Sequence, residues 1–130
     1  MNNILETNFI NGFIVENKKE RLIHEFSNPK KRENAILRFS HNVESIVNVK
    51  FIKHKCNIDN LKQIVNLKGN VYVISIEKID GENCLFEDAI VHLSEQYMPV
   101  IVITDNYIII KSECDSTKDN IFILFQTTTH

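Results

Sequence analysis

The sequence predicts one α+β or α/β domain in which N-terminal helices precede a mixed β-sheet with helices packed on it. Apolar residues recur at helical spacing in the first third of the chain, and continuous β-branched runs dominate the second half. No Pro- or Gly-rich linker divides the 130 residues. We therefore expect a single domain over residues 1–130, with residues 1–44 helical and residues 45–130 forming the sheet and two crossover helices.

Two helices are expected before residue 45. The stretch ENKKERLIHEF has a helical apolar stripe made of Leu22, Ile23 and Phe26. Ser27 or Asn28 can cap the next helix because its side chain accepts from free backbone amides, and Pro29 suits the first turn. The stripe that this second helix should bury is Ala35, Ile36 and Phe39.

A strand and a third helix are expected next. From Ser45 onward the apolar residues Val47, Val49 and Phe51 alternate with polar ones, which is typical of a strand with one buried face. Asn57 or Asp59 then caps a helix over residues 58–65, and Gly69 provides a left-handed stop.

The remaining elements alternate between apolar strands and turn signals. VYVISI at residues 71–76 predicts a central strand, Asp80-Gly81 a turn, and LFEDAIVHLSEQY a helix. Pro99 opens the strand VIVIT, which the pair Asp105-Asn106 joins to YIIIK as a hairpin, and IFILF forms the last strand.

The predicted order is therefore α-α-β-α-β-α-β-β-β. We expect right-handed helical crossovers between the first three strands and antiparallel strands after them. The hairpin VIVITDNYIIIK and the strand IFILF are long and apolar, so at a bare sheet edge they would favour pairing into a homodimer.

Composition favours a cytoplasmic globular protein. The formal net charge is −2, hydrophobic residues make up 43 % of the chain, and the start MNNILETNF lacks a secretory pattern. No apolar run approaches the length of a spanning helix. The cysteines Cys56, Cys84 and Cys114 are widely spaced, so we interpret them as free thiols.

Charge is divided unevenly along the chain. Residues 1–69 hold 12 Lys and Arg against 7 Asp and Glu, a net charge of +5, whereas residues 70–130 hold 3 against 10, a net charge of −7. If the two halves present opposite signs to solvent, the acidic half favours docking of a basic protein. An alternative is that exposed helices and loops carry charge of either sign by chance.

The first functional hypothesis is a non-enzymatic protein-binding domain, an inhibitor or immunity-type protein of bacteria that neutralises a basic partner such as a nuclease toxin. This hypothesis rests on the charge division and on analogy with small cytosolic inhibitors. The carboxylates expected to form the partner-binding surface are Glu77, Asp80, Glu82, Glu87, Asp88, Asp105, Glu113 and Asp115.

The second hypothesis is a nucleic-acid-binding or nucleic-acid-processing domain. Its phosphate contacts would come from the basic helices of residues 18–38, chiefly Lys30, Lys31, Arg32 and Arg38, together with Lys18, Lys19 and Arg21. Acids interrupt this set at Glu16, Glu20, Glu25 and Glu33, and no stacking aromatics accompany it, so a solvated helical face explains it as well.

Catalytic chemistry has a weaker signal. If the strands are parallel, the loops that contain His54, Asp80, Glu82 and Asp105 end at one edge of the sheet and could form a polar pocket. The run KHKC places His54 close to Cys56, but catalytic partners are usually distant in sequence. Because HExxH, P-loop and GxGxxG motifs are absent, we expect neither a metal nor a cofactor.

Overall fold

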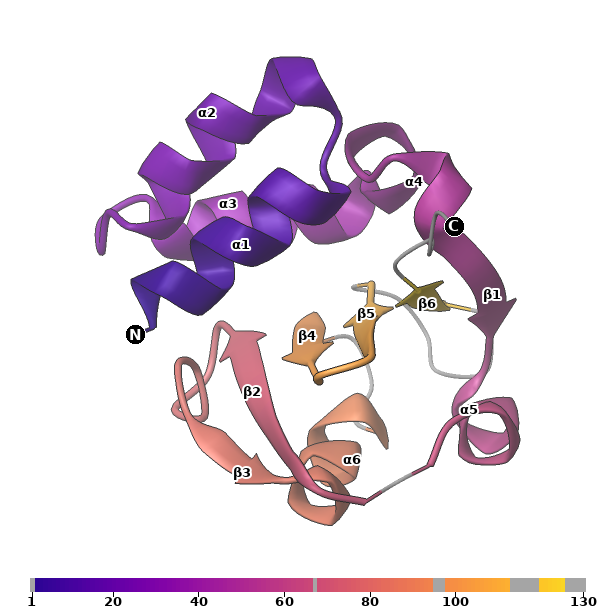
Figure 1. Ribbon diagram of the computed structural model, residues 1–130. Coiled ribbons are helices and arrows are strands. Elements are labelled where there is room, and N and C mark those ends of the chain that lie inside the picture. Colours follow the sequence, from indigo (N-terminus) through magenta and orange to yellow (C-terminus); the bar gives the residue numbers. More distant parts are fainter. Residues whose placement is uncertain (1, 67, 95–97, 113–119, 126–130) are drawn as a thin grey trace.

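Helices cover both faces of a central β-sheet (Figure 1). The computed structural model describes residues 2–66, 68–94, 98–112 and 120–125. Helices α1 (Asn3–Phe13), α2 (Glu16–Phe26), α3 (Arg32–His41) and α4 (Val43–Ile46) form a layer on one face. Helices α5 (Ile58–Ile64) and α6 (Phe86–Ser94) cover the other face. The predicted α+β class is confirmed.

Helix α1 was not among the predicted elements. Asn2 caps it through a hydrogen bond from the backbone N–H of Leu5 to its side-chain oxygen at 3.0 Å. Leu5, Phe9 and Phe13 recur every fourth residue, which is the spacing of one helical face. The same spacing is visible in the sequence and is the signal by which this helix could have been predicted.

Helices α2 and α3 agree with the prediction, apart from the start of α3. The stripe Ala35, Ile36 and Phe39 is buried as expected. The helix begins at Arg32 and not at Pro29, because the preceding residues form a turn. In that turn the side-chain oxygen of Asn28 accepts from the backbone N–H of Lys30. The backbone carbonyl of Asn28 accepts from the backbone N–H groups of Lys31 and Arg32. Asn28 therefore caps a turn that leads into the helix.

The strand predicted from the alternation of Val47, Val49 and Phe51 is wrong. Residues Val49–Phe51 form a 3-10 turn, and strand β1 follows at Ile52–Cys56. The Asn48 side chain accepts from the backbone N–H of Lys50, which stabilises that turn. Three alternating residues were too short a pattern to exclude this competing local structure.

The sheet contains β1, β2 (Asn70–Ser75), β3 (Asn83–Leu85), β4 (Val100–Ile103), β5 (Tyr107–Lys111) and β6 (Ile121–Phe125). The strand order is β1-β6-β5-β4-β2-β3, and every neighbouring pair is antiparallel. The prediction of a mixed sheet with parallel crossovers is therefore wrong.

The short strand β3 explains this difference. The predicted helix begins at Leu85, and no strand is predicted before it, but Asn83–Leu85 pair with β2 after a turn in which Gly81 has a φ of 79°. This hairpin reverses the chain once more before α6. Strand β4 consequently returns antiparallel to β2, instead of parallel to it.

The most apolar strands lie inside the sheet. Strands β4 and β5 form the predicted hairpin across Asp105-Asn106, and β6 pairs with β5 on one side and β1 on the other. The edge strands are β1 and β3. The apolar hairpin and the strand IFILF are therefore not bare edges, and they give no reason to expect two copies to pair through them. Strand β1 exposes Lys53, His54 and Lys55, charges that discourage edge pairing.

Both faces of the sheet are buried, which accounts for the continuous apolar runs. In β2, Tyr72 and Ile74 pack under helices α1–α4, whereas Val71 and Val73 pack against α5 and α6. The same alternation continues in β4, β5 and β6. Among the described residues, none of the helices has the length and apolar content that crossing a membrane would need.

Candidate functional site

Three of the predicted acidic residues flank β3. Glu82 precedes β3, and Glu87 and Asp88 occupy the first turn of α6; all three are exposed. The turn before Glu82 is fixed by backbone hydrogen bonds, among them Gly81 N–H to the Val73 carbonyl at 2.8 Å. Carboxylates in a first helical turn also interact favourably with the helix dipole, so their presence there has a structural explanation as well.

Two apolar side chains of the same two elements are also exposed. Leu85, the last residue of β3, is 47 % exposed, and Val91 on α6 is 58 % exposed. Val91 follows Glu87 and Asp88 by one helical turn and therefore shares their face of α6. We call Glu82, Leu85, Glu87, Asp88 and Val91 the β3–α6 surface.

The negative charges of this surface affect the pKa of Cys84. Burial raises the pKa of the Cys84 thiol, and the negative charges of Asp88 and Glu82 raise it further. Both carboxylates therefore act on one point of β3. The thiol stays protonated and free, so it is a poor nucleophile.

Asp80, a predicted partner-binding residue, instead binds Arg32, a predicted phosphate-binding residue. Asp80 accepts from Arg32 Nε at 2.7 Å and from Nη2 at 2.8 Å. The same guanidinium donates to both carboxylate oxygens of Glu6 at 2.5 and 2.8 Å. Arg32 is 5 % exposed, so it holds α1, α3 and the β2–β3 turn together inside the protein.

Tyr72 completes this buried network. Its hydroxyl donates to Glu6 Oε2 at 2.5 Å and accepts from the Asn2 backbone N–H at 2.9 Å. Burial and then the hydrogen bond to Glu6 raise the pKa of Tyr72 to about 12. Burial alone would lower the pKa of Arg32, but its bonds to Asp80 and Glu6 outweigh that effect and raise it. Sequence reasoning identified neither Glu6 nor Tyr72 as a charge partner.

The other predicted acids lie apart from the β3–α6 surface or outside the described residues. Glu77 is half-buried and lines a shallow hollow with Lys78 and His92. Asp105 is exposed in the β4–β5 turn, beside a groove formed with α1. Glu113 and Asp115 lie outside the described residues, as does Cys114.

The predicted polar pocket of strand-end loops is not formed. His54 lies on the edge strand β1, whereas Asp80 and Glu82 lie in the turn between β2 and β3 at the opposite edge of the sheet. The pocket depended on parallel strands, and the antiparallel order separates these loops. Within the described part of the chain, no three His, Cys, Asp or Glu side chains are arranged to hold a metal ion.

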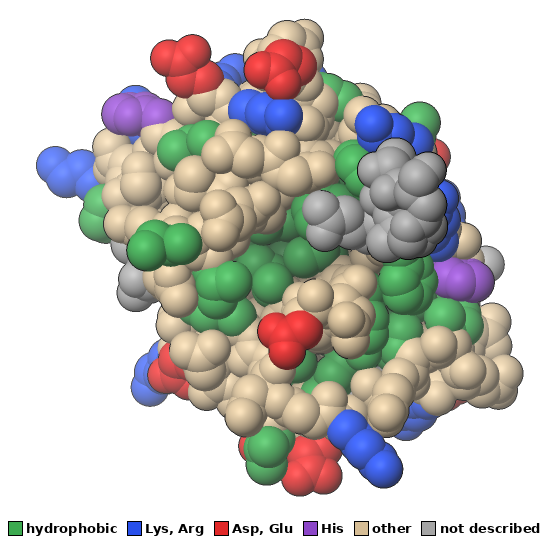
Figure 2. Space-filling model, viewed as in Figure 1, with side chains coloured by type: hydrophobic (Ala, Val, Ile, Leu, Met, Phe, Trp, Pro, Cys, Tyr) green, Lys and Arg blue, Asp and Glu red, His purple; other side chains and the backbone are tan. Residues whose placement is uncertain are grey.

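Positive and negative charges are not separated between the two sides of the molecule. Figure 2 shows acidic and basic side chains interspersed over one face. Lys62 on α5 and nearby Lys68 come from the basic half of the sequence, yet α5 packs on the same face of the sheet as α6. The basic and acidic halves of the sequence therefore do not form a basic side and an acidic side of the molecule.

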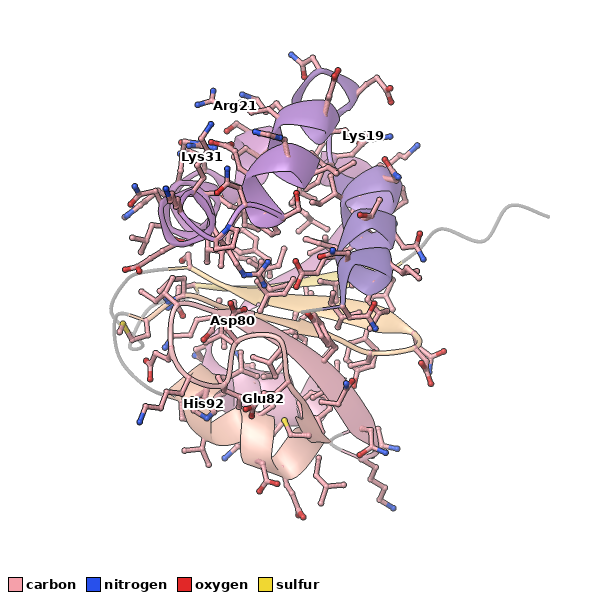
Figure 3. The ribbon with its side chains drawn as sticks, turned by 90° about the vertical axis from the view of Figure 1, so that its left-hand side faces the viewer. Lys19, Arg21, Lys31, Asp80, Glu82 and His92 are labelled. Atoms are coloured by element: carbon pink, nitrogen blue, oxygen red, sulfur yellow. The ribbon has the colours of Figure 1, made fainter. Side chains whose placement is uncertain are left out.

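One local gathering of positive charge lies on the outside of the helical layer. Lys30 and Lys31 are exposed before α3, and Arg38 is half-buried further along it. Figure 3 places Arg21 and Lys31 in this layer, with Glu82 and His92 beyond the sheet. Two hollows open here, and Arg21 and Arg38 line both of them.

Comparisons of the chain with protein-family models, curated proteins and solved structures give no match. The two surfaces therefore have to be interpreted from their own geometry and chemistry.

Proposed function

We propose that this protein is a non-enzymatic binding domain whose β3–α6 surface docks a basic protein. The observation that carries the proposal is the combination of exposed Leu85 and Val91 with the exposed carboxylates Glu82, Glu87 and Asp88. Apolar side chains provide buried contact area in an interface, and the charged residues around them orient the partner.

The sign of the charge determines the partner's chemistry. The chain contains no Lys or Arg from residue 79 to residue 110, so the segment that supplies this surface has only negative charges. A partner with lysines or arginines would complement it and would be steered toward it at low ionic strength.

The specific form of the proposal is an inhibitor of immunity type. A nuclease toxin needs a basic surface to hold the phosphates of its substrate. A protein that covers this surface with carboxylates and two apolar contacts would exclude the substrate without carrying out any reaction. Asp80 does not belong to the docking surface in this proposal, because it binds Arg32.

The test first asks whether a gene beside the one for this chain encodes a basic protein. That protein is then purified, its association and dissociation rates with this chain are measured by surface plasmon resonance, and inhibition of its nuclease activity is the second readout. The variant Glu82→Lys/Glu87→Lys/Asp88→Lys should weaken binding by at least about tenfold, mainly through slower association. Leu85→Ser/Val91→Ser should weaken it through faster dissociation.

The control reverses two exposed carboxylates elsewhere, in Glu44→Lys/Asp59→Lys, and is compared with Glu87→Lys/Asp88→Lys, which changes the net charge by the same amount. Wild-type affinity of the triple lysine variant, or equal weakening by the control, would contradict the proposal. A mass measurement on the free protein tests the separate expectation of a homodimer, for which the exposed edges are β1 and β3.

A further inference from the structure

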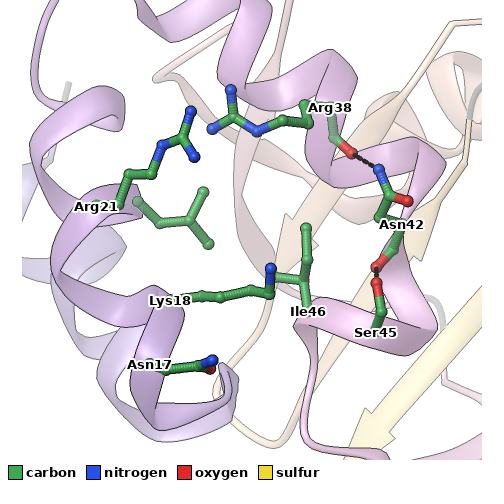
Figure 4. A pocket seen from close by; sticks show the side chains of 8 residues that line it. Asn17, Lys18, Arg21, Arg38, Asn42, Ser45 and Ile46 are labelled. Atoms are coloured by element: carbon green, nitrogen blue, oxygen red, sulfur yellow. Dashed lines mark hydrogen bonds between the residues drawn. The ribbon is translucent and has the colours of Figure 1, made fainter.

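Two adjoining hollows lie on the outer surface of the helical layer, away from the β3–α6 surface. The first has a volume of about 340 Å³ and is lined by residues of α2, α3 and α4 (Figure 4). Its polar lining consists of Asn17, Lys18, Arg21, Arg38, Asn42 and Ser45. The second has a volume of about 370 Å³. Its charged lining residues are Arg21, Glu25, Lys30, Lys31 and Arg38, and His24 also lines it.

Glu25 holds the two shared arginines in place from beneath. Its Oε1 lies 3.3 Å from Arg21 Nε and also accepts from Arg38 Nη2. The Glu25 side chain is only 12 % exposed, whereas those of Arg21 and Arg38 are 72 % and 36 % exposed. Each guanidinium has five N–H donors, so donors remain that face solvent after the contact with Glu25.

Lysines extend this arrangement on both sides. Figure 4 shows Arg21 and Arg38 pointing toward each other at the rim while Lys18 reaches across the hollow toward Ile46. Lys30 and Lys31 line the second hollow. Among the described residues, no carboxylate lies within ion-pairing distance of these three lysines.

The acids that interrupt the basic sequence do not interrupt the hollows. Glu16 pairs with Lys19 at 2.9 Å, and neither residue lines a hollow. Glu20 and Glu33 are exposed but also lie outside both linings. Of the described residues that line the hollows, Glu25 alone carries a negative charge, against five cations.

We propose that this twin hollow binds phosphate groups. Arg21 and Arg38 would hold a phosphate at the junction, Lys18 would contact a group in the first hollow, and Lys30 and Lys31 a group in the second. Guanidinium groups match the geometry of phosphate oxygens, and lysines add positive charge. No Phe, Tyr or Trp is found among the described lining residues, so the contacts select phosphate and not a stacked base.

Successive phosphates occur in a nucleic-acid backbone and in free polyphosphates. Two probes distinguish these sources: a fluorescein-labelled single-stranded oligonucleotide, followed by anisotropy, and inorganic tripolyphosphate, used as its competitor. Binding of either probe at this site supports the proposal. A nucleic-acid ligand is indicated if the oligonucleotide binds more tightly and log K falls with log salt by about 0.7 for each phosphate contact.

Arg21→Gln/Arg38→Gln should weaken oligonucleotide binding by at least about tenfold, because charge-assisted hydrogen bonds are lost. Lys18→Gln should weaken it several-fold. Lys19→Gln is the matched control, since it removes the same charge from the neighbouring position of α2 without touching a hollow. Circular dichroism and the melting temperature would establish that each variant is folded.

Equal weakening by Lys18→Gln and Lys19→Gln would overturn the proposal, because it would show that only net charge matters. Absence of binding by both probes at low salt would also overturn it. Neither result depends on a protein partner at the β3–α6 surface, so this site and the proposed function can fail separately.

Discussion

Arg32 and Arg38 lie on the same helix, and each binds carboxylates, but their surroundings differ. Arg32 is 5 % exposed and contacts Glu6, Asp80 and the Phe26 carbonyl, so its donors are used inside the protein. The Arg38 side chain is 36 % exposed and contacts Glu25 at the edge of two hollows. A basic residue in this sequence can therefore tie elements together or remain available to a ligand, and burial decides which.

The largest expected effect is on stability when the buried arginine is removed. Arg32→Met should lower the free energy of unfolding by about 3–5 kcal/mol, because Glu6 and Asp80 would be left without their cation. Arg38→Met on the same helix should cost about 1 kcal/mol or less. Urea denaturation of both variants measures the difference. Similar losses would show that the two arginines are energetically equivalent.

Neutralising the partners should restore part of that loss. In Arg32→Met/Glu6→Gln/Asp80→Asn no buried charge remains unpaired, so the triple variant should be more stable than Arg32→Met by about 1–2 kcal/mol. The same two carboxylate changes made with Arg32 intact serve as the control and should destabilise the protein. If the loss in the triple variant instead equals the sum of the losses in Arg32→Met and in the double carboxylate variant, the three residues are not coupled as the geometry indicates.

A third prediction concerns the pH dependence of the buried network. The pKa of Tyr72 is raised from 10.0 to about 12, so the unfolded chain releases this proton at lower pH than the folded protein does. The resulting stabilisation is complete below pH 10 and is lost as the pH rises through 12. Denaturation at pH 8 to pH 11.5 should show a smaller decline for Tyr72→Phe than for wild type. Equal declines would contradict the raised pKa.

The smallest expected effect on stability belongs to the exposed cluster. Arg21→Gln removes a pair with Glu25 in which the arginine side chain is 72 % exposed, so the free energy of unfolding should fall by only about 0.3–0.5 kcal/mol. Thermal denaturation at low and high salt would measure this loss and its screening. A loss of several kcal/mol in the free energy of unfolding would show that Arg21 has a structural role like that of Arg32.

Much of the fold follows from local patterns. The second and third helices, the Asn57 cap, the Asp80-Gly81 turn and the β4–β5 hairpin were all predictable because each depends on residues close in sequence. The direction of the strands was not predictable from local patterns. It depended on recognising β3, whose three residues carry too little pattern to distinguish a strand from a helix start.

The candidate sites were predictable to different degrees. The residue types of both surfaces were identified from sequence, including Glu82 and Glu87 on one and Lys30 and Arg38 on the other. The exposure of Leu85 could not be predicted, because Leu85 is an apolar residue that opens the predicted helix LFEDAIVHLSEQY. Exposure depends on what packs against a residue, and long-range packing is absent from the local pattern.

The sequence by itself determined which segments are apolar enough to form a layered domain and where most turns and caps occur, because these preferences act over a few neighbouring residues. Only the tertiary structure decided which charges face one another. It joined Arg32 to Asp80, far away in sequence, and left Arg21 and Arg38 at the surface. Attraction between charges depends on their separation in space and on burial, and neither is set by separation along the chain.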